Sequence, residues 1–261
     1  MKKSYFHPFH IVELSPWPLV GSLAVGSMLV NLYSLLSGGT MIPAVVSLIS
    51  TILVSVQWWR DVIRESAFQG NHTSYVCSGL YLGVSMFIVS EVFFFFSFFF
   101  GYFFIALNPD ISLGDWPPVG VQPMSYMGVP VVNTVLLLSS GVSITWAHHS
   151  ILESNQVNVK LGLSLTVLLG LVFLVFQGFE YFECSFSMAD SVYGSLFFIA
   201  TGFHGLHVMV GMIFILVCSV RVWKNHFSNK HHLGLEASIW YWHFVDVVWL
   251  FLFLTVYWWG S

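Results

Sequence analysis

Long apolar runs separated by short polar segments recur along the whole chain. A helix needs about 20 predominantly apolar residues to cross the hydrocarbon core of a bilayer, and these runs are of that order. Pro43 and Pro130 stand near the starts of two runs, where proline suits the first turn of a helix. The pattern predicts seven membrane-spanning helices, at 17–36, 41–59, 75–106, 131–152, 157–178, 191–222 and 233–258. We therefore expect an all-α, polytopic membrane protein whose residues 1–261 form a single transmembrane domain.

The amino-acid composition supports the assignment to a membrane, and the N-terminal sequence bears on where the chain is synthesised. Hydrophobic residues make up 57% of the chain and charged residues 8%, whereas about a quarter of the residues in a soluble domain are charged. Cys77, Cys184 and Cys218 are far apart and indicate neither a metal site nor a disulfide framework. The N-terminus resembles neither a secretory signal peptide nor an import presequence, which favours synthesis inside a bacterium or an organelle. No nucleic-acid partner is expected.

Basic residues indicate the orientation of the predicted helices, because loops on the cytoplasmic side of a membrane attract Lys and Arg. With seven spans, every Lys and Arg falls on the side of the N-terminus: Lys2, Lys3, Arg60, Arg64, Lys160, Arg221, Lys224 and Lys230. The charged residues assigned to the opposite loops are all acidic: Asp110, Asp115, Glu180, Glu183 and Asp190. We expect the N-terminus on the basic side of the membrane and the C-terminus on the other side.

Two acids are predicted inside membrane helices, where an ionisable group is costly and usually functional. Glu91 lies near the middle of 75–106, and its own helix offers no polar partner. The residues three and four positions from it are all apolar: Phe87, Ile88, Phe94 and Phe95. Glu91 is therefore either hydrogen-bonded across helices or involved in proton- or lipid-linked regulation. Asp246 follows His243 by three residues on one helix face, as either a structural hydrogen bond between helices or a proton relay.

Eleven histidines raise the question of a metal or haem site. His204 and His207 are three residues apart, face the same way and cannot supply the two opposite axial ligands of one haem. The pair superficially resembles a histidine box of membrane di-iron desaturases, but such boxes gather at one membrane face and this pair is expected near mid-depth. We expect hydrogen-bonded structural histidines, with no metal ligand, no cofactor and no catalytic residue in this chain.

Basic and aromatic residues gather on the N-terminal side at the level of lipid headgroups. The second predicted helix ends in Trp58 and Trp59, and Arg60 and Arg64 follow four residues apart on one face. Arginine presents a planar fork of donors that suits phosphate oxygens. The cluster is either a snorkelling helix end or a site for a specific phospholipid. In the second case, further basic residues would join it: His72, Arg221, Lys224 and His231.

The same segments closely resemble subunit III of the haem-copper cytochrome c oxidases, in its mitochondrially encoded form. The resemblance runs along the full chain and rests on long strings that are highly specific. These strings are Ser15–Leu19, Trp58–Ser66, Phe68–Gly70, Ser90–Phe94, Ser139–Ser150, Thr201–His207, Trp240–Leu250 and Tyr257–Ser261.

The resemblance implies a fold and a set of site residues. Two N-terminal helices and a bundle of five would enclose a V-shaped cleft that holds phospholipid, with Glu91 on the third helix near it. Residues that match lipid-contacting positions are Trp59, Arg64, Glu65 and His72, with His231 nearby. Arg221 and Lys224 match basic positions at headgroup level that could hold an anionic lipid such as cardiolipin. Haem and copper would belong to partner subunits, and this chain would carry neither.

The function that the resemblance implies is that of a non-catalytic core subunit of the terminal respiratory oxidase. It would stabilise the catalytic subunit, bind phospholipid and support proton uptake. Its main contact would be subunit I, with other oxidase subunits nearby and no direct contact with cytochrome c. We expect it in the mitochondrial inner membrane, with the N-terminus in the matrix and the C-terminus in the intermembrane space. Two rival hypotheses are a histidine-box membrane oxygenase and a proton channel that uses Glu91 and Asp246.

Overall fold

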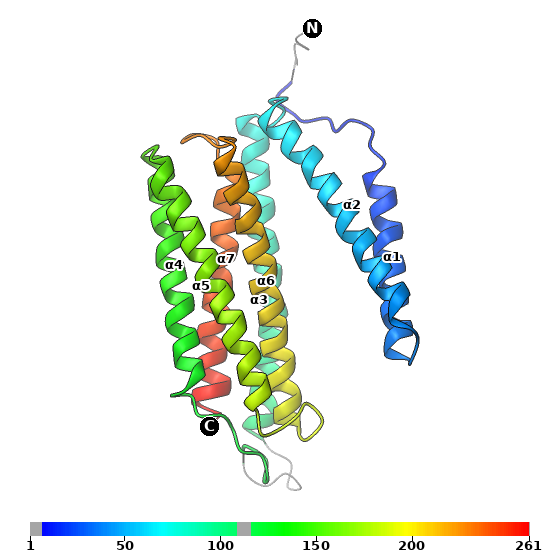
Figure 1. Cartoon of the computed structure of the whole chain (residues 1–261), viewed down its shortest axis with the longest axis vertical. Helices are drawn as coiled ribbons and strands as arrows, with labels where there is room; N and C mark the ends of the chain where they lie inside the picture. Colours follow the sequence, from blue (N-terminus) through cyan, green and yellow to red (C-terminus); the bar gives the residue numbers. More distant parts are fainter. Residues whose placement is uncertain (1–6, 109–115, 261) are drawn as a thin grey trace. The chain divides into compact units, whose positions relative to one another are not determined.

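The computed structural model describes residues 7–108 and 116–260. Within these residues the secondary structure is helical: α1 (Trp17–Leu36), α2 (Met41–Ala67), α3 (Ser74–Ala106), α4 (Val129–Leu152), α5 (Gln156–Glu183), α6 (Val192–Trp223), α7 (Leu233–Leu252) and the short π-helix η1 (Phe253–Trp258) (Figure 1). With η1 continuing α7, they provide seven candidate membrane spans. The predicted all-α fold with seven spans is confirmed. Lys2, Lys3, Asp110, Asp115 and Ser261, which carried parts of the sequence argument, lie outside the described residues.

Two helices continue beyond the ends that their apolar runs predicted. α2 extends to Ala67 instead of residue 59, and α5 extends to Glu183 instead of residue 178. Glu180 therefore lies inside a helix, and its assignment to a loop was wrong. Arg, Glu and Gln are good helix formers, so the end of an apolar run marks where the residue types change and not where the backbone stops being helical.

The chain divides into two compact units, Met1–Leu80 and Tyr81–Ser261. In the first unit α1 and α2 form an antiparallel pair (Figure 1). The hydroxyl of Thr51 on α2 donates to the carbonyl of Ala24 on α1 at 3.2 Å. Near the basic end, the indole N–H of Trp17 donates to Asp61 Oδ2 at 2.7 Å. Polar contacts thus join the two helices near mid-length and at one end.

In the second unit, α4 and α5 form an antiparallel hairpin, and α7 packs against both α4 and α6 (Figure 1). Trp242 and Trp249 of α7 are fully buried. Their indole N–H groups donate to hydroxyls of α4, Trp242 to Ser140 at 2.9 Å and Trp249 to Thr134 at 3.0 Å. A buried indole needs such an acceptor, because no water is available in the core of a membrane bundle. These bonds fix the register of α7 against α4.

Aromatic rings join α3 to α6 and α7. The ring of Phe94 packs edge-on against Phe203 of α6 with centroids 5.1 Å apart. Phe95 contacts Phe244 of α7 at 6.1 Å. The phenylalanine-rich half of α3 is therefore an interhelical packing surface as well as a lipid-facing one.

Candidate functional site

Glu91 of α3 has a hydrogen-bonding partner on α6. Its Oε2 lies 3.0 Å from Nε2 of His207, and both side chains are largely buried. The other ring nitrogen of His207, Nδ1, lies 2.7 Å from the carbonyl oxygen of Phe203. The two residues are 116 positions apart. The structure therefore supports the interpretation of Glu91 as a carboxyl that is hydrogen-bonded across helices.

The contacts of His207 constrain where its hydrogens lie. A carbonyl oxygen can only accept, so Nδ1 must carry a hydrogen that it donates to Phe203. The contact between Nε2 and Glu91 then requires one more proton, which lies on the carboxyl of a neutral pair or on the imidazole of an ion pair. In both cases the two side chains share a single proton. The pair can hold that proton or pass it on, which is the chemistry expected of a proton-handling site.

Aromatic rings surround this Glu91–His207 pair. The ring of Phe95 lies 4.9 Å from the His207 ring, and the ring of Tyr241 stacks on it at 6.4 Å. Phe94 stacks on another side at 6.0 Å. These rings limit access of water and keep the local dielectric low, which strengthens the contact between carboxyl and imidazole.

The second predicted acid, Asp246, lies beside His243 as its spacing indicated. His243 Nδ1 is 3.8 Å from Asp246 Oδ2, which is too long for a hydrogen bond. Nε2 of the same ring is 3.3 Å from the hydroxyl oxygen of Thr145 on α4. That hydroxyl already donates to the Gly141 carbonyl at 2.8 Å, so it accepts from His243. His243 thus makes the hydrogen bond between helices, and Asp246 lies beside it without bonding to it.

In the first unit, two predicted lipid-binding residues belong to a shared charge cluster near the end of α2. Asp61 accepts hydrogen bonds from Arg60, with Nη2 at 3.1 Å, and from Trp17. Arg64 Nη1 lies 3.8 Å from the same carboxylate. Two guanidinium groups therefore share one carboxylate, and both are more than half exposed. They leave donors that can reach a phosphate, and Trp59 is exposed next to them. The sequence argument did not identify Asp61, which positions the cluster.

Glu65 and His72, also in the first unit, lie at a separate contact with the N-terminal segment. Glu65 Oε2 is 3.8 Å from Nε2 of His10. The rings of His10 and His72 lie 5.7 Å apart. A protonated His10 would therefore interact favourably with the Glu65 carboxylate at this point.

The remaining predicted lipid-binding residues, Arg221, Lys224 and His231, belong to the second unit. The guanidinium of Arg221 is half-buried over the ring of Phe227 at 4.1 Å, a cation–π contact. Lys224 is exposed. Burial, followed by the positive charges of Arg221 and Lys224, lowers the pKa of His226 in the adjoining loop. The end of α6 is therefore electropositive, as a site for an anionic headgroup requires.

The other mid-depth histidine singled out by its spacing, His204, has a structural contact. It is buried, and its Nε2 lies 3.2 Å from the carbonyl of Val245 on α7. Across residues 7–108 and 116–260, no three His, Cys, Asp or Glu side chains come together in an arrangement that could hold a metal ion.

Glu180 is the residue that sequence reasoning missed. Its side chain is 0% exposed, and Gln177 and Tyr257 lie close to it. Among the described residues, the polar side-chain atoms of these three make no hydrogen bond of ordinary geometry, although Tyr257 interacts with both Glu180 and Gln177. The signal was present in the sequence, because Gln177 and Glu180 continue the stripe of Thr166, Gly170 and Phe173 at intervals of three and four residues.

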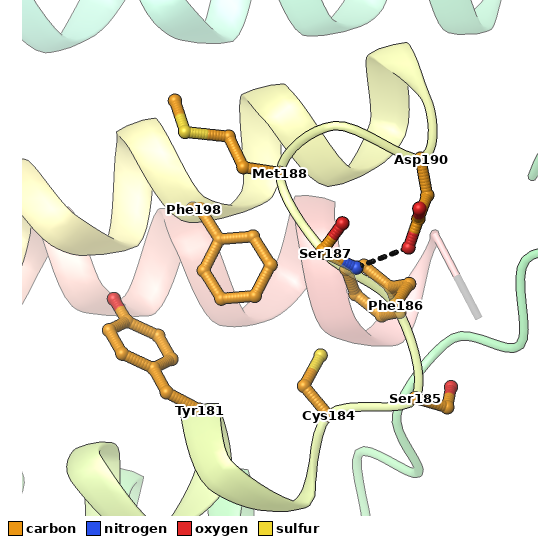
Figure 2. Close-up of a pocket in the computed structure, with 8 residues that line it drawn as sticks. All are labelled: Tyr181, Cys184, Ser185, Phe186, Ser187, Met188, Asp190 and Phe198. Atoms are coloured by element: carbon orange, nitrogen blue, oxygen red, sulfur yellow. Dashed lines mark hydrogen bonds between the residues drawn. The ribbon is translucent and has the colours of Figure 1, made fainter.

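An open pocket of about 510 Å³ lies where α5 leads into α6, away from every predicted site residue. Figure 2 shows the rings of Tyr181 and Phe198 next to each other, in an edge-on contact, with the Cys184 thiol nearby. Asp190 accepts a hydrogen bond from the Ser187 backbone N–H at 2.6 Å and so serves the turn itself. Burial raises the pKa of the Cys184 thiol, which makes it a poor nucleophile. The lining offers packing surface and no activated catalytic group.

Comparisons with known proteins agree with the predicted family. The family model of cytochrome c oxidase subunit III matches residues 7–261. Cytochrome c oxidase subunit 3 of Branchiostoma lanceolatum is 53% identical to this chain over 256 residues, which cover 98% of each sequence. The proteins of the same name from Equus caballus and Rattus norvegicus are each 52% identical over 256 residues, again with 98% of both sequences covered.

Proposed function

Because the chain belongs to the cytochrome c oxidase subunit III family, we propose that it is a non-catalytic core subunit of that oxidase. The observation that carries this proposal is the match of the family along residues 7–261. In the proposal, the chain stabilises the catalytic subunit I, binds phospholipid and supports proton uptake. Haem, copper and the cytochrome c contact belong to other subunits.

The three histidines near the middle of the membrane make hydrogen-bond contacts within this chain, which supports a non-catalytic role. His204 faces a backbone carbonyl, and His207 uses one nitrogen on a carbonyl and the other on Glu91. His243 uses Nε2 on Thr145. A metal bound to Nε2 of any of these three histidines would therefore displace an interhelical contact.

The test of the non-catalytic role is removal of this subunit from the purified oxidase. We expect the initial rate of electron transfer from cytochrome c to oxygen to persist, because the redox centres remain in place. Complete and immediate loss of electron transfer, with haem and copper content unchanged, would contradict the proposal. Iron or copper that stays with the isolated chain in a stoichiometric amount would contradict it as well.

Phospholipid binding is supported by the exposed guanidinium groups at the end of α2. Arg60 and Arg64 carry two positive charges against the one carboxylate of Asp61, so the cluster keeps a net positive charge. Lys224 and the half-buried Arg221 provide a second electropositive surface at the end of α6, where an anionic lipid such as cardiolipin would bind. The V-shaped cleft between a two-helix and a five-helix bundle stays a prediction from the resemblance.

The lipid proposal is tested by Arg64→Ala in the assembled oxidase, with Lys230→Ala as the control. Lys230 is an exposed base outside the proposed set. Quantitative mass spectrometry of co-purified phospholipid should show a loss for the Arg64 variant and none for the control. Equal lipid content in both variants would refute the site.

Support of proton uptake rests on the Glu91–His207 pair, which shares one proton inside an aromatic enclosure. In Glu91→Gln the pair loses its acidic proton donor but keeps a hydrogen-bonding side chain of similar shape. Because reduction of oxygen consumes protons, we expect slower proton uptake by the oxidase and a turnover that slows with it, with haem and copper content unchanged. Proton uptake at the wild-type rate would exclude this role.

We place the chain in the mitochondrial inner membrane, with the N-terminus in the matrix. This placement is supported by the grouping of basic residues at corresponding ends of the helices: Arg60, Arg64, Lys160, Arg221, Lys224 and Lys230. The end of α5, with Glu183, and the loop between α5 and α6, with Asp190, would face the intermembrane space.

A further inference from the structure

One stripe of α7 remains exposed although most of that helix is buried. The stripe contains Val247, whose side chain is half exposed, and Phe251, and it continues into η1 with Leu254. His243 opens the stripe and is 43% exposed. The steps from His243 through Val247 and Phe251 to Leu254 fit the spacing of three and four residues with which one helix packs along another.

α4 extends this exposed surface on the neighbouring helix. Val135, Leu138 and Val142 are exposed and continue at the same intervals to Thr145. The contact of 3.3 Å between Thr145 and His243 joins the two stripes. We call the combined surface, formed by Val135, Leu138, Val142, His243, Val247 and Leu254, the α4/α7 face.

His243 is poorly suited to a surface that meets only lipid tails. It lies ten residues into the span Leu233–Trp258, which is about 15 Å at ~1.5 Å per residue. That depth is close to the middle of a hydrocarbon core roughly 30 Å thick. Ionisable side chains at this depth normally face a bundle interior or a polar partner.

The hydrogen bonds around His243 leave acceptor atoms of His243 and Asp246 without a donor in the described part of the chain. Nε2 donates to Thr145, so in the neutral ring Nδ1 presents a lone pair. The nearest charged group is Asp246, whose Oδ2 is 3.8 Å from Nδ1. Oδ1 of Asp246 is buried and has no hydrogen-bond partner among the described residues. With His243 neutral and Asp246 ionised, Nδ1 and Oδ2 are both acceptors, and a donor placed next to these two atoms would satisfy both.

The Glu91–His207 pair shows the contrast within the same unit. There both ring nitrogens and one carboxyl oxygen are bonded by groups of this chain. The His243–Asp246 pair is more exposed on its histidine side and incompletely bonded. The first pair is complete in the subunit alone, whereas the second is not.

We propose that the α4/α7 face docks a transmembrane helix of another oxidase subunit, and that this helix presents a hydrogen-bond donor to the His243–Asp246 pair. The inference rests on the proposed function, which supplies the other subunits. A lipid tail has no donor, and a headgroup does not reach mid-depth. A second copy of this chain docked through the same face would bring the same acceptors and no complementary donor.

The experiment is site-specific photo-cross-linking in the assembled oxidase. A diazirine-bearing amino acid replaces Val247 on the α4/α7 face, and in a matched variant it replaces Val210 on α6, which is similarly exposed at 55%. We expect Val247 to cross-link to a membrane-spanning peptide of another oxidase subunit, with a hydroxyl, amide, indole or cationic side chain within one helical turn. The Val210 variant measures the yield of lipid adducts on an exposed position outside the face.

Three results would overturn the docking proposal: lipid adducts alone at Val247, a link to a second copy of this chain, or a link to α1 or α2 of the same chain. A linked helix without a donor near the cross-link would remove the role of the His243–Asp246 pair. The proposed function fails separately, if the unmodified chain does not co-purify with the oxidase.

A bulky substitution gives a second measurement that does not depend on cross-linking. Val247→Trp should obstruct the approaching helix and lower the amount of this chain retained in the detergent-purified oxidase several-fold. Val210→Trp should leave retention unchanged. Equal retention of both variants, with intact helical structure by circular dichroism, would contradict the assignment of the face.

Discussion

The packing of Trp242 against two glycines makes Gly170 a sensitive position in the second unit. A Cβ on Gly170 of α5 would lie 2.8 Å from Cη2 of Trp242, closer than atoms approach without a shift. The indole cannot easily move away, because its N–H donates to Ser140 and its other edge lies 3.1 Å from where a Cβ on Gly211 would stand. We therefore expect Gly170→Ala to overpack the core.

The expected change in stability of Gly170→Ala combines two opposing effects. Overpacking in a dense core costs about 1–3 kcal/mol. Replacing glycine by alanine inside a helix contributes about 0.5–1 kcal/mol of stability. The control, Gly178→Ala on the same helix, brings only the second effect, because nothing lies within 4 Å of its added Cβ. The two variants should therefore differ by about 1–3 kcal/mol.

The assay follows the buried thiol of Cys218 by peptide-level mass spectrometry. Cys218 is fully buried on α6, so a maleimide reaches it only when the helices separate. Because 1 kcal/mol corresponds to roughly 2–4 °C in a protein of this size, labelling in Gly170→Ala should begin roughly 2–12 °C below that in Gly178→Ala. Equal midpoints, or a higher midpoint for Gly170→Ala, would refute the role assigned to Trp242.

Three further outcomes are expected. His207→Ala should shift the infrared bands of the Glu91 carboxyl, with the carbonyl band of a protonated carboxyl moving to higher frequency, because the bond to Nε2 is lost; an unchanged spectrum would contradict the shared proton. Trp17→Phe removes the hydrogen bond to Asp61 and should lower the stability of the α1–α2 pair by about 1–2 kcal/mol. The measurement is proteolysis near residue 38, which should become faster in this variant. The matched substitution Trp59→Phe, at an exposed position, should leave the rate of proteolysis unchanged. A membrane-impermeant maleimide should label Cys184 only from the side opposite the basic residues. Its rate should keep rising above the ordinary thiol pKa, because burial raises the pKa of Cys184; labelling from the basic side would reverse the orientation.

The number of helices and most of their limits could be predicted from the sequence. A bilayer offers no partner for backbone N–H and C=O groups, so each long apolar run has to form a helix. The prediction was wrong at the end of α5, where the change from apolar to polar residues was taken for the end of the helix. For this reason Glu180 was placed in a loop, although it is a buried residue of the bundle.

The partners of the polar residues could not be predicted in the same way. Most of these helices are apolar on all sides, so no stripe of polarity distinguishes the face that meets protein from the face that meets lipid. The sequence argument did not single out Asp61, and only the fold shows that it joins Trp17 and Arg60.

The sequence by itself determined that the chain crosses a membrane, that it has seven spans and, through its long specific strings, to which family it belongs. The tertiary structure decided that Glu91 bonds to His207, that Glu180 is buried, and that His243 reaches an exposed face. The reason is physical. Crossing a bilayer depends on hydrophobicity summed along a segment, whereas a hydrogen bond across 116 residues depends on how whole helices are rotated and packed.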